Sequence, residues 1–356
     1  MRAESGLNMK RDPSTPRPGR LAAERQARRN ASLPSAALGA SRMTRLATAE
    51  AISVVLAMAL LAWRAAAQGP PNLMLPENQV TKVSDHVWAI IGFPNIGIVV
   101  GERGTLVVDT GLGPRNGAIA AREAQKLAKG PLLYLTTTHY HPEHAAGEGG
   151  FPANTIIARP VAQQKELEER GMQFVEMFSS RSPQMKELLA GVKFRAPDIV
   201  FDKEMTIDLG GVTARLFWMG QAHTKGDELV DVEPDSTLIS GDVVQNKVAP
   251  NLPDDNASMK GWIEILGKLR ASSYAHILPD HSPPGDGSLV EIDYQFFSLV
   301  QVRALELKRQ GKPADEAGQT LLAEFRAKFR DWSGLNAIPN IVKHVYAENQ
   351  LQAATN

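Results

Sequence analysis

Three histidines and one carboxylate lie within the six residues from His139 to His144, which read HYHPEH. Neutral imidazoles and carboxylates are the ligands that zinc prefers in proteins when cysteine is absent, and this chain contains no cysteine. A polar loop with coincidental histidines is the alternative, but these are three of only 8 histidines in 356 residues. The segment therefore predicts one half of a metal site.

The element that must position this segment is a β-strand, predicted over residues 132–138 from its apolar and threonine-rich composition. If the strand continues to His141, the alternation of side chains along a strand sends His139 and His141 to the same side. Pro142 then ends strand pairing, and a turn can bring the following acid and histidine toward the same point.

Three later segments also place polar residues where predicted strands end. His223 lies on the loop after a strand predicted over 212–218, Asp242 follows the next strand, and His281 follows a short strand near residue 278. Each signal is weak by itself, because a loop histidine is often a plain surface residue. Their order along the chain and their placement at strand ends favour a single site on loops held by a rigid sheet.

Taken in order, these motifs resemble the metallo-β-lactamase fold superfamily of zinc hydrolases over about residues 83–282. The stretch from Asp109 to Gly111 supplies the family's first motif. The resemblance implies an α/β fold, a four-layer αβ/βα sandwich, with one or two zinc ions at the strand ends. By position, the resemblance implies one ion held by His139, His141 and His223, a second held by Glu143, His144 and His281, with Asp242 bridging both and Asp109 orienting the ligands from behind.

Two positions depart from the family's pattern. The family usually has aspartate where Glu143 stands, and the extra methylene moves the carboxylate outward, so the alternatives for the second ion are that it is bound differently, more weakly or not at all. The family's last motif is usually Pro-Gly-His-Gly, whereas Asp280 and Ser282 flank His281 here, which removes backbone freedom from that loop. His281 is therefore the least secure ligand of the set.

The ligand set predicts hydrolysis by a metal-bound hydroxide, because zinc lowers the pKa of bound water to about 7. Glu143 and Asp242 are the carboxylates expected to take part in the reaction. The chain has no Gly-x-Ser-x-Gly nucleophile motif that competes with this chemistry. The predicted substrate is a carbonyl compound, namely an ester, lactone, thioester or lactam. The alternatives are a true metallo-β-lactamase and a non-catalytic accessory protein that retains the fold.

Four residues adjacent to the motifs are candidate substrate contacts, although a surface or packing role fits each of them as well. These candidates are Tyr140, Lys225, Asn246 and Trp262. The histidines outside the motifs, His86, His276 and His344, are expected to be ordinary packed or exposed residues.

The first 67 residues differ in composition from the rest. Residues 1–42 are rich in Arg, Ala, Ser and Pro and predict a disordered segment, or an extension upstream of a natural start at Met43. Residues 43–67 have a basic start, an apolar run and a small-residue end, which predicts a cleaved signal peptide. A membrane anchor is the rival, but the run is short for a span. We therefore expect a periplasmic or secreted protein without a stable membrane anchor.

The formal net charge of zero hides an asymmetry between the two ends of the chain. Residues 1–67 hold 11 Lys or Arg against 4 Asp or Glu, which leaves residues 68–356 with a net charge of −7. An acidic body argues against a nucleic-acid-binding surface, so the expected partner is a small-molecule substrate.

After a linker over 68–79, the apolar patterns predict a catalytic α/β domain over 80–288 and a helical extension over 289–356. Strands are expected over 83–91, 96–100, 105–109, 132–138, 155–158, 199–201, 205–209, 212–218, 237–240 and 276–278. Helices are expected over 116–128, 161–178, 184–189, 262–269, 289–309, 314–329 and 341–351. The apolar residues of the last helices predict core packing or the interface of a homodimer.

Overall fold

The computed structural model describes residues 72–252 and 256–355, and residues 72–356 form one compact unit. The predicted N-terminal extension and signal peptide lie outside the described residues. None of the described helices is both long enough and apolar enough to cross a membrane.

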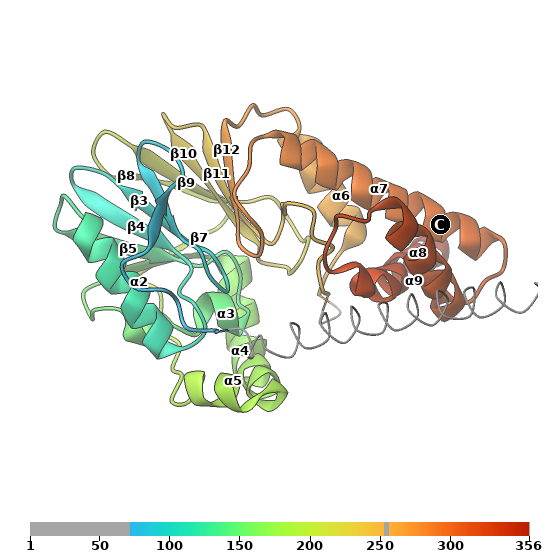
Figure 1. The fold of residues 1–356 in the computed structure, drawn as a ribbon, viewed down its shortest axis with the longest axis horizontal. Helices are drawn as coiled ribbons and strands as arrows, with labels where there is room; N and C mark the ends of the chain where they lie inside the picture. Colours follow the sequence, from blue (N-terminus) through green and yellow to red (C-terminus); the bar gives the residue numbers. More distant parts are fainter. Residues whose placement is uncertain (1–71, 253–255, 356) are drawn as a thin grey trace, which may run out of the picture. The chain divides into compact units, whose positions relative to one another are not determined.

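Two β-sheets form the centre of this unit (Figure 1). The first sheet contains, in spatial order, β1 (Val80–Lys82), β2 (Val87–Ile90), β3 (Ile96–Val100), β4 (Gly104–Val108), β5 (Leu132–Thr136), β6 (Ile156–Pro160) and β7 (Ile199–Phe201). The second contains β12 (His276–Pro279), β11 (Thr237–Gly241), β10 (Glu228–Glu233), β9 (Thr213–Trp218) and β8 (Glu204–Asp208).

Parallel pairing determines where the functional loops lie. Strands β4, β5, β6 and β7 run parallel to one another, and β11 is parallel to β12. Such strands need crossover connections, which α2 (Pro114–Leu127) and α4 (Val161–Arg181) provide in the first sheet and α6 (Met259–Leu269) provides in the second. The carboxyl ends of parallel strands meet at one edge, so the loops that carry the predicted ligands are brought together there.

Alternating side chains divide the interior into layers. In β4, Leu106 and Val108 pack between the two sheets, whereas Val107 packs toward Ile119 and Ala120 of α2. Side chains of the second sheet complete the inter-sheet core, as expected for two sheets packed face to face. Helices α2 and α6 therefore cover opposite outer faces, and the predicted four-layer αβ/βα sandwich is confirmed.

The C-terminal helices continue the outer layer of the second sheet. Helices α7 (Ser288–Arg309), α8 (Ala314–Lys328) and α9 (Ile338–Thr355) share one apolar cluster with α6 and the second sheet. Within it, the ring centroids of Trp262 and Phe297 are 4.8 Å apart. The predicted helical extension is present, and it shares a core with the residues that precede it.

The sequence-based prediction missed one break within a strand and one whole strand. The strand predicted over 83–91 is divided, because the backbone N–H groups of Val83 and Ser84 donate to the carbonyl of Val87 and reverse the chain, which pairs β1 with β2. Strand β10 was missed because acidic residues interrupt its apolar pattern. Two of them have partners in the fold: Glu228 accepts a hydrogen bond of 2.6 Å from the Thr136 hydroxyl, and Asp231 pairs with Arg215 at 2.9 Å.

Part of the predicted linker is packed against the domain. Leu73 and Leu75 are buried, and the side chain of Asn116 donates to the Leu73 carbonyl and accepts from the Leu75 N–H. This connection fixes the segment against α2, so the folded chain extends upstream of the predicted boundary at residue 80.

Candidate metal centre

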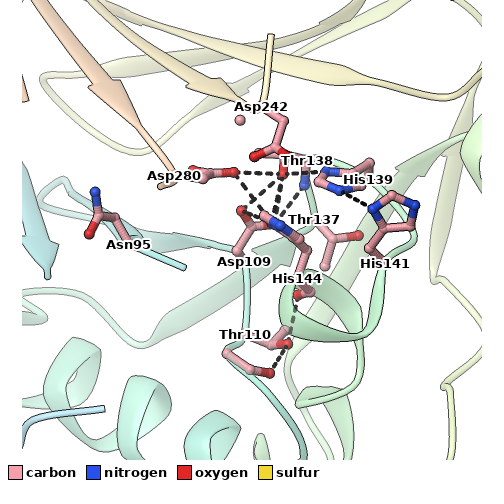
Figure 2. Close-up of polar contacts among 12 residues, drawn as sticks. Asn95, Asp109, Thr110, Thr137, Thr138, His139, His141, His144, Asp242 and Asp280 are labelled. Atoms are coloured by element: carbon pink, nitrogen blue, oxygen red, sulfur yellow. Dashed lines mark hydrogen bonds and ion pairs between the residues drawn. The ribbon is translucent and has the colours of Figure 1, made fainter. Parts of the chain in front are cut away.

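Three imidazoles meet beyond the end of β5. The Nδ1 atom of His141 lies 2.9 Å from Nε2 of His139 and 3.2 Å from Nε2 of His223 (Figure 2 shows the first pair). Donors bound to one tetrahedral zinc at about 2.0–2.1 Å are separated by about 3.4 Å, so these spacings fit a single ion. The strand ends at Thr136 rather than continuing to His141, so a loop produces the convergence and not the alternation of a strand.

A second group lies beside the first. Glu143 and His144 occupy the short helix α3 (Pro142–Ala145), and the ligand atoms of Glu143, His144 and His281 all lie within 4.8 Å of one another. The Nε2 atoms of His144 and His281 are 3.3 Å apart. The Oε2 atom of Glu143 is buried and has no hydrogen-bond partner among the described residues. A buried oxygen without a partner is unusual, and a bound cation would satisfy it.

Asp242 lies between the two groups. Its Oδ2 atom is 3.2 Å from Nε2 of His223, and its Oδ1 atom is 3.3 Å from Nε2 of His281. The structure therefore brings together all seven predicted ligands, and Asp242 has the position of a bridge between two ions. The donor set of imidazoles and carboxylates fits divalent zinc.

Burial and neighbouring charges favour the ligand form of His139 and of Asp242. Burial lowers the pKa of His139 well below its usual value, and the imidazoles of His144, His141 and His223 lower it further. Burial would raise the pKa of Asp242, but the imidazoles around it, first His281 and His223, lower it to about 2. His139 is thus neutral and Asp242 ionised near neutral pH, as metal ligands must be.

Behind His144, two carboxylates share one ring nitrogen. Oδ2 of Asp109 lies 3.1 Å and Oδ2 of Asp280 lies 3.3 Å from Nδ1 of His144. The Thr138 hydroxyl lies within hydrogen-bond distance of both carboxylates, 2.9 Å from Oδ2 of Asp109 and 3.0 Å from Oδ2 of Asp280, and Asp109 also accepts from the Thr138 N–H at 2.7 Å (Figure 2). Asp109 thus has the orienting position that the resemblance implied. The role of Asp280 was missed, because the family's pattern has glycine there.

The loop that carries His281 is held without glycine. The described residues with a positive φ do not include Asp280 or Ser282, so neither position requires the left-handed conformation that favours glycine. The side-chain amide of Asn95 donates to the carbonyls of Pro279 and Ser282 at 2.8 and 2.9 Å. Gln245 accepts from the Ser282 hydroxyl and donates to the Gly241 carbonyl, which joins the His281 loop to the Asp242 loop. Sequence reasoning missed Asn95 and Gln245, since neither belongs to a motif.

A buried carboxylate organises the His223 loop. Asp227 accepts hydrogen bonds from the N–H groups of Ala222 and Thr224 on either side of His223. Burial, with the nearby charge of Glu166, raises the pKa of Asp227 to about 8. Glu166 itself accepts from the N–H groups of Lys225 and Gly226. The backbone N–H groups of the loop are therefore held by two carboxylates, that of Asp227 within the loop and that of Glu166 on α4.

The structure places the four predicted substrate contacts outside the lining of the cavity beside the metal centre. Tyr140 is buried against His141, and buried Trp262 donates its indole N–H to the Val243 carbonyl. Asn246 donates to the Pro283 carbonyl, and Lys225 is exposed. Tyr140 and Trp262 pack behind the ligand loops instead, and a substrate contact by any of the four stays a prediction.

The cavity itself has a volume of about 300 Å³. Five predicted ligands open onto it, namely His141, Glu143, His223, Asp242 and His281. The rest of the lining includes Phe93, Phe178, Arg181 and the segment 248–251. A substrate placed here reaches both groups of ligands from one side.

This chain resembles a curated protein, the linear primary-alkylsulfatase of Pseudomonas sp. (strain ATCC 19151). It is 23% identical over 294 residues, which are 70% of this chain and 54% of that protein. The chain thus spans about half of the length of the curated relative that it matches.

Solved structures share the fold. The stereoselective inverting sec-alkylsulfatase Pisa1 from Pseudomonas sp. superposes with a TM-score of 0.59 at 15% identity, over 74% of this chain and 49% of that one. DIM-1 metallo-beta-lactamase superposes with a TM-score of 0.50 at 17% identity, over 63% of this chain and 99% of that one.

The sequence pattern of the Metallo-beta-lactamase superfamily matches residues 89–281, a segment that contains every one of the seven converging side chains. This match covers more than half of the 356 residues. The chain therefore belongs to the metallo-beta-lactamase superfamily.

Proposed function

We propose that this protein is a zinc-dependent hydrolase that cleaves an ester-type bond of a small molecule. The observation that carries the proposal is the position of Asp242 between two groups of ligand atoms that open onto one cavity. Zinc, when bound, supplies a nucleophile derived from water at neutral pH and an electrophile for the oxygen that gains charge.

The chain's own residues supply the rest of the chemistry. The buried imidazoles hold their donor atoms toward one side, which removes the cost of organising the site during the reaction. Burial raises the pKa of Glu143 even though His144 and His281 act against this. Glu143 also lines the cavity, so we assign to it a second role, the movement of a proton during departure of the leaving group through the carboxylate oxygen that does not hold a cation.

Carbonyl compounds are the first substrate class that we propose, namely esters, lactones, thioesters and lactams. The apolar walls of the cavity suit the hydrocarbon part of such molecules. The proposal of a true metallo-β-lactamase is tested separately, by hydrolysis of a chromogenic cephalosporin.

Sulfate monoesters are the second class. They are favoured by the similarity to a protein described as a linear primary-alkylsulfatase and by the larger share of this chain that superposes on the alkylsulfatase Pisa1. The same ligand atoms suit both classes, because each reaction moves negative charge onto oxygen atoms held near the cations.

The experiment combines a metal count with a substrate panel. Purified protein is expected to hold one or two zinc ions, to hydrolyse at least one member of either class, and to lose activity on chelation and regain it with zinc. His139→Ala is expected to abolish activity, whereas His344→Ala is the control on α9, away from the site. A zinc content near zero after purification with zinc would overturn the proposal and support a non-catalytic accessory protein.

We also propose that the protein is exported, on the basis of the composition of residues 43–67. Fractionation of cells and N-terminal sequencing test this, with a mature terminus near Gln68 as the expected result. Full-length protein in the cytoplasmic fraction would contradict it. The homodimer and the absence of nucleic-acid binding stay predictions.

A further inference from the structure

Arg181 is the one lysine or arginine among the described residues that line the cavity beside the metal centre. The walls near it are apolar, with Phe93, Phe178 and the stretch from Val248 to Pro250. The ligands Glu143 and Asp242 form the acidic side of the same cavity. The space therefore has a cation-binding side, an apolar wall and a separate cationic group.

The guanidinium group of Arg181 is held in place by an aromatic ring. Arg181 is the last residue of α4, and its Cζ atom lies 3.8 Å from the ring centroid of Phe178, which is itself buried. The hydroxyl of Ser182 accepts a hydrogen bond from Met185 N–H and begins α5 (Pro183–Leu188), so α4 ends directly after Arg181. A guanidinium stacked on a ring keeps the N–H groups at its edge available for a ligand.

No acidic side chain in the described part of the chain forms an ion pair or a hydrogen bond with Arg181. Several other arginines differ in this respect: Arg159 pairs with Glu148, Arg215 with Asp231 and Arg303 with Glu324. The charge of Arg181 is thus not neutralised by a neighbour, and the group lies where a bound molecule would meet it.

We propose that Arg181 binds an anionic oxygen group of the substrate, so the substrate combines a carboxylate or a sulfate with an apolar portion. Guanidinium binds both anions through paired N–H···O hydrogen bonds, and the apolar wall takes the hydrocarbon portion. This inference rests on the proposed function, because it assumes that the substrate is cleaved at the metal centre. It adds that the enzyme selects anionic molecules over neutral ones.

Two sources of the anion give different kinetics. If the anion is the sulfate that is cleaved, Arg181 contacts the reacting group, and its removal lowers kcat as well as raising KM. If the anion is a carboxylate elsewhere in the substrate, removal of the Arg181 guanidinium group raises KM and leaves kcat nearly unchanged.

The test compares Arg181→Gln and Arg181→Lys with the control Arg170→Gln. Arg170 lies on the same helix and over another ring, that of Phe174 at 5.3 Å, but it does not line the cavity. Calorimetry measures the binding of octyl sulfate, octanoate and neutral octanol to the zinc-loaded protein and to the chelated protein. Turnover is measured with octyl sulfate, with a carboxylate-bearing half-ester and with the matching neutral ester.

We expect Arg181→Gln to weaken the binding of one or both anions at least about tenfold, with octanol unchanged, because one charged hydrogen-bonding group is lost. Arg181→Lys is expected to recover part of the loss, since it restores the charge without the paired geometry. Arg170→Gln is expected to resemble the wild type. Equal binding of anions by wild type and Arg181→Gln, or an equal loss for octanol, would overturn the inference.

The two proposals fail in different ways. If the zinc-loaded protein turns over no substrate but still binds anions through Arg181, the hydrolase proposal fails and the anion site stands. If octyl sulfate and the half-ester each keep the same kcat and KM, relative to those of the neutral ester, in wild type and Arg181→Gln, the hydrolase proposal stands and the anion site fails.

Discussion

The carboxylate of Asp280 lies 3.3 Å from Nδ1 of His144, the same ring nitrogen that Asp109 approaches at 3.1 Å. A carboxylate at this nitrogen fixes the ring orientation and makes the opposite nitrogen a better ligand. Here two carboxylates do so from different loops. Asp280 also lies beside His281, so one residue connects two ligands of the second group.

Removing either carboxylate is expected to weaken metal binding at the second group. Asp109→Asn and Asp280→Asn should each lower zinc affinity there by about 10- to 100-fold, the usual effect of losing such a partner. Asp109→Asn should have the larger effect, because Asp109 also accepts from the Thr138 backbone. Titration against a chromogenic chelator measures both. Asp286→Asn is the control, since Asp286 is exposed on the loop after His281. An unchanged affinity in Asp280→Asn would show that Asp280 has no role in orienting His144.

Shortening the acidic ligand tests how the second ion is held. Glu143→Asp is expected to bind the second ion as tightly as the wild type or more tightly, because aspartate is the residue that the family usually has there. Glu143→Gln should bind it at least about tenfold more weakly, since the amide carries no charge. Metal analysis and titration measure the two variants together. Loss of both ions in Glu143→Asp would contradict the assignment of Glu143 as a ligand.

A glycine beside Asp242 tests the packing of the bridge. Gly241 has a φ of +55°, and a Cβ atom there would lie 2.8 Å from Cβ of Thr138. Gly241→Ala is therefore expected to cost about 2–4 kcal/mol in the free energy of unfolding, from backbone strain and crowding together. Gly211 has a φ of +83° with nothing within 4 Å, so Gly211→Ala should cost only the strain, about 1–2 kcal/mol.

Urea unfolding of the chelated proteins measures both costs without a contribution from metal. Zinc affinity should fall in Gly241→Ala alone, because a displaced Thr138 disturbs the ligands around it. Equal costs for the two variants would mean that the contact with Thr138 relaxes freely.

Stability should depend on pH through Asp235. This buried carboxylate accepts from the Ser84 hydroxyl and the His86 N–H, each at 2.6 Å, and contacts Nδ1 of His86 at 2.7 Å. Burial acts to raise the pKa of Asp235, but these hydrogen bonds lower it below the usual value. The folded protein then binds fewer protons at this group than the unfolded chain does. Its stabilisation is therefore present above the unfolded pKa of about 3.9 and is lost as the pH falls through the folded pKa.

Asp235→Asn is accordingly expected to be less stable than the wild type by about 1–2 kcal/mol at neutral pH. The difference should shrink as the pH falls below about 4, because the wild-type carboxylate then becomes protonated. Urea unfolding of the chelated proteins at several pH values measures this. A difference that is constant down to acid pH would show that the charge of Asp235 contributes nothing.

The ligands were predictable because each one is part of a short local pattern. The pattern HYHPEH is complete within six consecutive residues, and His223, Asp242 and His281 each follow an apolar strand. Strand β10 was not predictable in the same way, because Glu228 and Asp231 look unfavourable until Thr136 and Arg215 are known to meet them.

The sequence by itself determined which residue types are available, the order in which strands carry them, and therefore the family. Only the tertiary structure decided that a loop after Thr136 brings His139 and His141 together, that Asp280 reaches His144, and that Arg181 lines the cavity. Composition and periodicity are local properties of the chain. Distances between residues far apart in sequence depend on strand register, loop hydrogen bonds and the packing of helices, which no short segment contains.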